Sequence, residues 1–108
     1  SELRNGKVTD LVLDPAAYGF SQGTIDDYRG GSPEENAATL RAILSGQEHG
    51  AKREIVLFNA AAGFYAAGIA DTIEDGLKLA ASVIDSGKAM RKLDELIAIS
   101  NAEEAAAV

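Results

Sequence analysis

The most constraining stretch of this sequence is the apolar run IVLFNAAAGFYAA, residues 55–67. From Ile55 to Ala62 the only polar residue is Asn59. A helix that is apolar on nearly every side is usually buried on nearly every side. We therefore expect a core helix within residues 51–68, with Asn59 buried in it. The chain has 108 residues, so few other elements can surround this helix.

Capping signals predict a helix just before this run. Ser32 suits the N-cap, Pro33 suits the first helical position, and Glu35 follows three residues after Ser32, which is a capping box. Gly46 is placed to end the helix. One stripe of this helix carries apolar residues: Ala37, Leu40, Ile43 and Leu44.

Two further helices are predicted after the apolar run. The third begins near Thr72, with Asp75 three residues later, and ends at Ser86-Gly87. The fourth covers residues 88–99. We expect residues 32–99 to form one helical region and the tail, residues 100–108, to fray because it has little to bury. The apolar positions that support these two helices are Ile73, Leu77, Ala80, Ala81, Ile84, Met90, Leu93, Leu96 and Ile97.

The start of the chain predicts a β-hairpin over residues 1–14. Asn5-Gly6 is the strongest two-residue turn signal, and Val8 and the run LVL at residues 11–13 supply β-prone residues on the return strand. Residues 15–31 are rich in turn formers and are expected to be loop with a short helical turn at most. The predicted fold class is α+β, mostly helical, with one partial domain. Because the sequence opens inside a strand pattern, we expect it to be part of something longer.

Charge and composition exclude several classes of function. The chain has ten basic and seventeen acidic residues, a net charge of −7, which disfavours binding to nucleic acid or to anionic membranes. It has no cysteine, which excludes disulfides and Cys-type zinc sites and fits a cytoplasmic location. No apolar run reaches the length of a membrane span, and no signal peptide is evident.

The pair Gly30-Gly31 before the first helix raises the possibility of a phosphate cradle, because helix N-termini bind anions. The alternative is a plain helix cap. Glu34 and Glu35 favour the cap, since each would repel a singly charged anion at about 5 Å by roughly 3 kcal/mol at an effective dielectric near 20. The pattern also lacks a P-loop lysine and a GxGxxG spacing.

The remaining polar candidates each have a structural explanation. Asp26-Asp27 and Asp94-Glu95 could in principle hold Mg²⁺, but neighbouring helical residues diverge, and Asp94-Glu95 lie among basic residues. His49, the single histidine, lies in a linker with no partner evident. Asn59 either bonds backbone or faces a ligand.

Two further glycines, Gly63 and Gly68, lie among alanines and suggest a close approach between helices, or between a helix and a sheet, rather than a ligand site. The residues by themselves therefore assign no catalytic, cofactor-binding or metal-binding position.

Several blocks occur together in an order typical of one enzyme family. They are ELRNGKV, LDPAAYGF, RGGSPEENAATLRAILSG, REIVLFNAAAGFYAAG and VIDSGKAMRKLDELI. In combination they resemble the C-terminal part of the larger α/β domain of the anthranilate phosphoribosyltransferases, over nearly the whole chain up to about Ile99. No single block would be sufficient for this identification.

The resemblance implies a parent enzyme that joins anthranilate to phosphoribosyl pyrophosphate with Mg²⁺ and releases pyrophosphate, in tryptophan biosynthesis. It also implies that the family's functional residues lie elsewhere. The GTGGD phosphate loop, the Asp-Glu metal pair and the anthranilate contacts all precede this segment, so Gly30-Gly31 and Asp94-Glu95 are not their counterparts. The segment is then scaffolding, inactive alone, and its partner is the remainder of the parent polypeptide or a second copy of itself.

Two alternatives from other classes remain open. A stand-alone helical interaction module could bury its apolar helix and its hairpin edge against a partner chain. A small anion-binding domain would use Gly30-Gly31 and would respond to phosphate.

Overall fold

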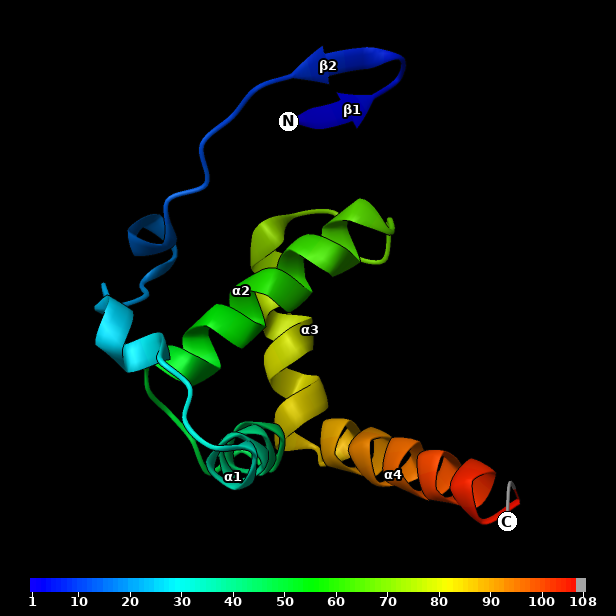
Figure 1. Cartoon of the computed structure of the whole chain (residues 1–108). Helices are drawn as coiled ribbons and strands as arrows, with labels where there is room; N and C mark the ends of the chain where they lie inside the picture. Colours follow the sequence, from blue (N-terminus) through cyan, green and yellow to red (C-terminus); the bar gives the residue numbers. More distant parts are fainter. Residues whose placement is uncertain (107–108) are drawn as a thin grey trace.

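The fold is mostly helical with a small hairpin at the start of the chain, as predicted (Figure 1). The structure, a computed structural model, describes residues 1–106, with side chains described through Ala102. No helix in that range is both long and apolar enough to cross a membrane. The elements in chain order are β1 (Glu2–Arg4), β2 (Lys7–Thr9), the 3₁₀ turns η1 (Pro15–Tyr18) and η2 (Ile25–Tyr28), α1 (Pro33–Leu44), α2 (Ala51–Ala66), α3 (Ile73–Asp85) and α4 (Lys88–Ala106).

The hairpin has the turn that its sequence predicts. Asn5 and Gly6 both have positive φ, 52° and 75°, as a type I′ turn requires. The strands pair antiparallel, with Leu3 opposite Val8. The prediction that residues 11–13 continue the return strand was wrong, because β2 ends at Thr9.

Helix boundaries follow the predicted caps. The Ser32 hydroxyl accepts from the Glu35 N–H and the Glu35 carboxylate accepts from the Ser32 N–H, so the capping box is formed. Gly46 follows α1 with φ 79°, and Gly87 follows α3 with φ 79°. The Thr72 hydroxyl accepts from the Asp75 N–H at 3.0 Å and caps α3. Local side chains therefore set where α1 and α3 begin.

The core lies where α2 crosses α3 (Figure 1). Leu57 of α2 packs with Ala80 and Ile84 of α3. Gly76 of α3 lies directly against Ala61 of α2, because a Cβ added at Gly76 would be 2.8 Å from the Ala61 carbonyl oxygen. Gly76 thus allows the two backbones to approach closely.

The close approach predicted at Gly63 and Gly68 was wrong. A Cβ at either glycine would meet nothing within 4 Å. Gly68 has φ 73° and serves the turn after α2 instead. The close contact falls at Gly76 because that residue lies on the apolar stripe of α3, three residues after Ile73.

Helix α2 is exposed along one stripe, formed by Ile55, Asn59, Gly63 and Ala66, and only two of its residues are fully buried, so it is less buried than the prediction of burial on nearly every side required. Leu57 and Ala61 are buried, whereas Ile55 is 44% exposed. Asn59 is exposed as well, so the prediction of a buried amide was wrong. The reason is geometric: among the described elements α3 makes the main contact with α2, and one helix covers one face of another.

The last helix is longer than predicted. Helix α4 runs to Ala106, through most of the tail that was expected to fray. Alanine and glutamate, which dominate this tail, are among the best helix formers. The helix extends away from α3 (Figure 1), and an ion pair of 3.8 Å between Arg41 and Asp94 connects it to α1.

Candidate functional site

The start of α1 is a closed cap. Besides the capping box, the Gly31 N–H donates to Asn36 Oδ1 at 2.9 Å, and the Asn36 Nδ2 donates to the Gly31 carbonyl at 3.2 Å. The N–H groups of Gly31, Ser32 and Glu35, which a phosphate would need, therefore bond to side chains of the chain itself.

The two glycines have a steric explanation in this cap. A Cβ added at Gly31 would lie 2.2 Å from Glu35 Oε2, and one at Gly30 would lie 3.0 Å from Asn36 Oδ1. Both side chains fold back over the glycines, so a larger residue at position 31 would displace the capping carboxylate. The cap interpretation of Gly30-Gly31 agrees with this geometry.

Electrostatics at this cap also work against an anion. Hydrogen bonds from the backbone and then the hydroxyl of Ser32 lower the pKa of Glu35. The carboxylate is thereby stabilised in its charged form beside the place that a phosphate would occupy. A polar hollow of about 410 Å³ next to the cap is lined by Arg29 and Lys52 as well as Glu35, but Arg29 is already paired with Asp26 at 3.0 Å.

The side chains of the two acidic pairs form capping hydrogen bonds and ion pairs within the chain. Asp27 accepts from the Thr24 N–H at 2.6 Å and from the Thr24 hydroxyl, and these bonds lower its pKa. Asp94 pairs with Arg41, and Glu95 pairs with Lys92 at 2.5 Å. Within the described residues no group of three or more His, Asp or Glu side chains could hold a metal ion. The residues present here do not fit a Mg²⁺ site.

Neither of the two remaining candidates, His49 and Asn59, lines the hollow beside the cap. His49 is exposed in the linker between α1 and α2. The Asn59 Nδ2 donates to the Ile55 carbonyl at 2.8 Å, within its own helix. This bond to backbone is one of the two roles that the sequence left open for Asn59.

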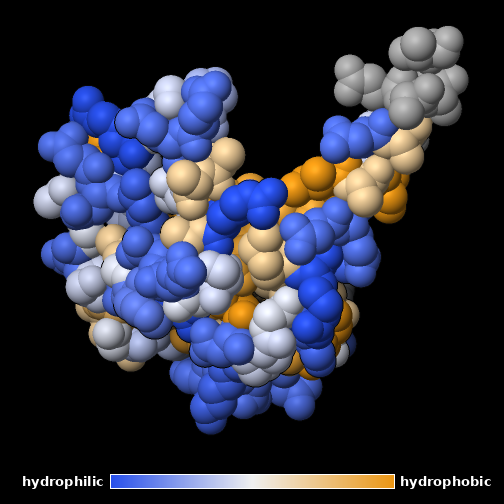
Figure 2. Space-filling model, turned by 90° about the horizontal axis from the view of Figure 1, so that it is seen from below, coloured by the Kyte–Doolittle hydropathy of each residue, from blue (hydrophilic) through white to orange (hydrophobic). Residues whose placement is uncertain are grey.

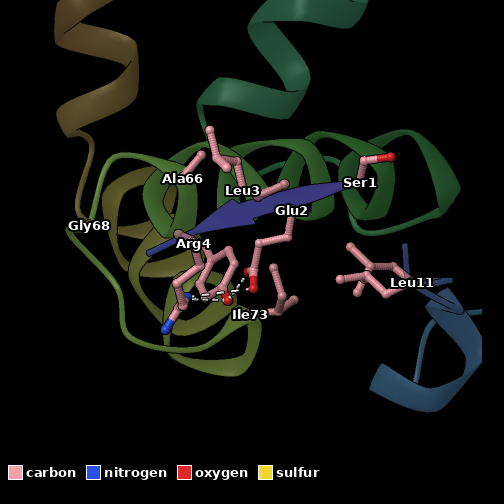
Figure 3. A pocket seen from close by; sticks show the side chains of 11 residues that line it. Ser1, Glu2, Leu3, Arg4, Leu11, Ala66, Gly68 and Ile73 are labelled. Atoms are coloured by element: carbon pink, nitrogen blue, oxygen red, sulfur yellow. Dashed lines mark hydrogen bonds and ion pairs between the residues drawn. The ribbon is translucent and has the colours of Figure 1, made fainter. Parts of the chain in front are cut away.

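One side-chain cluster, between the hairpin and α2, was not predicted from the sequence. Tyr65 near the end of α2 donates its phenol proton to Glu2 and accepts from Arg4 Nη2 at 2.6 Å (Figure 3). The Arg4 guanidinium also lies 5.3 Å from the centroid of the Tyr65 ring. This cluster fastens the hairpin to α2 across more than sixty residues of sequence, which no local pattern could indicate.

The cluster borders a cavity of about 720 Å³, and its phenol is not poised to give up its proton near neutral pH. The hydrogen bond to Glu2 raises the pKa of Tyr65 above its ordinary value of 10, so the phenol stays protonated. The cavity wall is otherwise largely apolar. Its lining residues include Leu3, Leu11, Leu13, Ala62, Ala66 and Ile73.

A second long-range contact connects α2 to the end of α3. Arg53 Nη2 donates to both carboxylate oxygens of Asp85, at 2.9 and 3.1 Å. The Arg53 side chain is only 11% exposed. This pair positions helices and touches no pocket described above.

Comparison with known proteins gives the same family that the sequence blocks indicate. The family described as "Glycosyl transferase family, a/b domain" matches residues 1–90. Among curated proteins, an anthranilate phosphoribosyltransferase of Acetivibrio thermocellus is 46% identical over 101 residues, which cover 94% of this chain and 29% of that protein. The enzyme of the same name from Rhizobium rhizogenes is 47% identical over 102 residues, covering 94% of this chain and 30% of the relative.

A third such relative, from Pelotomaculum thermopropionicum, is 49% identical over 96 residues, 89% of this chain and 28% of the relative. The chain thus spans less than a third of the length of these relatives. No solved structure matches. Because the family match extends over 90 of its 108 residues, the chain belongs to the glycosyl transferase family, in its a/b domain.

Proposed function

We propose that this chain is the C-terminal part of the larger α/β domain of an anthranilate phosphoribosyltransferase. That enzyme would transfer a phosphoribosyl group from phosphoribosyl pyrophosphate to anthranilate in tryptophan biosynthesis, in the cytoplasm. The chain would act as scaffold within it and would be inactive alone. The relatives at 46–49% identity carry this enzyme name, and one structural observation supports the scaffolding role.

That observation is the excess of exposed surface. The chain exposes 7670 Å², whereas a folded monomer of 11.2 kDa is expected to expose about 5,700 Å². Its radius of gyration is 16.6 Å, against roughly 13 Å for a compact chain of this length. Surface of this extent is ordinarily covered by more protein.

Much of the excess is apolar and lies on several elements. Ile55 on α2 is 44% exposed, and Leu96 and Ile99 on α4 are 60% and 62% exposed. Figure 2 shows hydrophobic surface along the projecting arm, which is α4, and in the hollow beside it. Scattered apolar residues are normal at a surface, but here large apolar side chains are exposed on α2, on α4 and in the segment after β2. We infer that the remainder of the parent domain covers these faces.

The substrates and Mg²⁺ of the parent would be bound by residues outside this segment. Asp26, Asp27, Asp94 and Glu95 already have capping or ion-pair roles, so neither of these acidic pairs is free to hold the ion. The contribution of this chain is therefore to position the parts of the domain that do bind.

The test is an activity assay with anthranilate, phosphoribosyl pyrophosphate and Mg²⁺. We expect no turnover by the 108-residue chain and normal turnover by the full-length protein from the same gene. Mixing the chain with a second fragment, which contains only the part of the parent ahead of Ser1, should restore part of the activity. Turnover by the chain alone near that of the full-length protein would refute the scaffolding role. A full-length protein inactive with anthranilate would refute the assigned activity.

A stand-alone interaction module is the second candidate, and the two-stranded sheet favours it. Each strand has an unpaired edge within the described residues, and such edges accept further strands. Sedimentation of the isolated chain tests the need for a partner. A stable monomer with cooperative unfolding would remove the need for a partner, whereas a dimer that shares strands would favour the module.

A further inference from the structure

The segment after β2 is strongly apolar yet unpaired. Leu11, Val12 and Leu13 are 47%, 92% and 38% exposed, although this run is β-prone and directly continues the return strand. The strand assignment stops at Thr9. Local propensity therefore does not explain where β2 ends.

The pairing register does explain it. Glu2 lies opposite Thr9, Leu3 opposite Val8 and Arg4 opposite Lys7, so the numbers of paired residues sum to eleven. The next pair is Ser1 with Asp10, and the Ser1 hydroxyl indeed donates to Asp10 Oδ1 at 2.6 Å. In the same register residues 11–13 would face the first, second and third residues ahead of Ser1. β2 ends where its partner strand ends.

The space for such residues exists. The cavity of about 720 Å³ has Ser1, Leu11 and Leu13 in one wall and residues of α2 and α3, including Ala62 and Ile73, in the other. In Figure 3, Ser1 and Leu11 lie at the same end of this cavity. Three extended residues span about 10 Å, which such a cavity can accommodate.

The side-chain pattern indicates that this strand is covered on both faces. If the pleat continues, Leu11 and Leu13 lie on the same face as Glu2 and Arg4, the face that contacts Tyr65. Val12 then lies on the other face, together with Leu3. Both faces are then apolar at residues 11–13. A continuous apolar run of this kind is typical of strands whose two faces are both covered.

We propose that residues 11–13 pair antiparallel with the three residues immediately ahead of Ser1 in the longer polypeptide. The hairpin then becomes a longer pair of strands that fills the cavity over α2 and α3. The inference rests on the proposed function, because it requires polypeptide ahead of Ser1. The partner is an extended segment of the same chain, and the register is fixed by the turn at Asn5-Gly6.

Amide hydrogen exchange of the full-length protein tests the pairing. The two-residue turn makes Arg4 and Lys7 a hydrogen-bonded pair. Because hydrogen-bonded and non-hydrogen-bonded pairs alternate along antiparallel strands, the N–H groups of Leu11 and Leu13 would donate to the residues ahead of Ser1. We expect their exchange to be at least about a hundredfold slower than in an unfolded peptide of the same sequence. Exchange of both at the peptide rate would overturn the proposal.

A disulfide test fixes the register, since the 108 residues contain no cysteine. The test uses the full-length protein with any other cysteine replaced. Val12→Cys is combined with a cysteine at the second residue ahead of Ser1, because the proposed register places these two residues directly opposite each other. The control combines Leu13→Cys with that same upstream cysteine, which puts the two thiols on opposite faces. We expect the first pair to oxidise at least about tenfold faster than the control. Equal rates, or a faster control, would overturn the register.

The activity of the same full-length protein separates the two proposals. An active enzyme with unprotected Leu11 and Leu13 amides would refute the strand extension and leave the proposed function standing. An inactive protein in which these amides are protected and the cross-link forms would refute the proposed function and support the extension.

Discussion

Helices α2 and α3 both carry many apolar residues, but α3 buries more of its residues within this chain. Four residues along α3 are buried, Ile73, Gly76, Ala80 and Ile84, and they form one stripe. On α2 only Leu57 and Ala61 are buried, although apolar residues surround the helix. The difference teaches that an amphipathic helix needs one neighbour and an apolar helix needs several. α2 therefore keeps apolar surface that α3 alone does not cover.

The largest expected effect comes from truncating the buried side of α2. Leu57 is 8% exposed and Ile55 is 44% exposed. We expect Leu57→Ala to lower the free energy of unfolding of the chain by about 2–5 kcal/mol, because it leaves a cavity, and Ile55→Ala by about 1 kcal/mol or less. Urea denaturation measures both. Equal losses of unfolding free energy in the two variants would show that both sides of α2 are packed, and would contradict the difference described between them.

The next effect concerns the backbone contact between α2 and α3. A methyl group at Gly76 would lie 2.8–3.1 Å from Ala61, mostly against backbone, so Gly76→Ala should cost about 1–3 kcal/mol. Gly63→Ala is the matched control on the open side of α2. It should stabilise the chain by about 0.5–1 kcal/mol, because alanine favours helix and nothing obstructs its methyl group. Thermal unfolding measures the change in stability of each variant. If both substitutions stabilise the chain, or both destabilise it, the close approach at Gly76 is refuted.

A smaller effect is expected where α2 is joined to the end of α3. Asp85→Asn removes the charge that faces Arg53, and a buried guanidinium without its partner is costly. Because Asp85 itself is 57% exposed, we expect a loss of about 1–2 kcal/mol rather than the full cost of a buried pair. Asp75→Asn in the first turn of α3, away from this pair, is the control. A loss at Asp85 no larger than at Asp75 would contradict the role of the pair.

The smallest effect concerns pH and the cap of α1. The folded-state pKa of Glu35 is lowered from 4.5, so its contribution to stability is present above that pH and is lost as the pH falls through the folded-state pKa. Glu35→Gln should therefore flatten the acid limb of the stability curve and leave its dependence near neutral pH unchanged. The melting temperature between pH 3 and 7 measures this. An unchanged acid limb would show that the capping bond contributes nothing.

The caps and turns were predictable because their causes are local. Ser32 and Glu35 lie three residues apart, and Asn5-Gly6 requires only its own backbone conformation. The roles of the long-range pairs were not predictable, since nothing near Tyr65 indicates Glu2 and nothing near Arg53 indicates Asp85. Gly76 could have been recognised from its place on the apolar stripe of α3, a clearer signal of close approach than the alanines around Gly63.

The sequence by itself determined the family, the helix starts and the hairpin turn, because each depends on residues a few positions apart. It also predicted a core helix at α2, since apolar residues lie on nearly every side of this segment. Only the tertiary structure decided which side of α2 is covered by α3 and where Gly76 meets Ala61. Those outcomes depend on which segments are available to pack and pair, and burial of a side chain is a property of its neighbours in space, not of its neighbours in sequence.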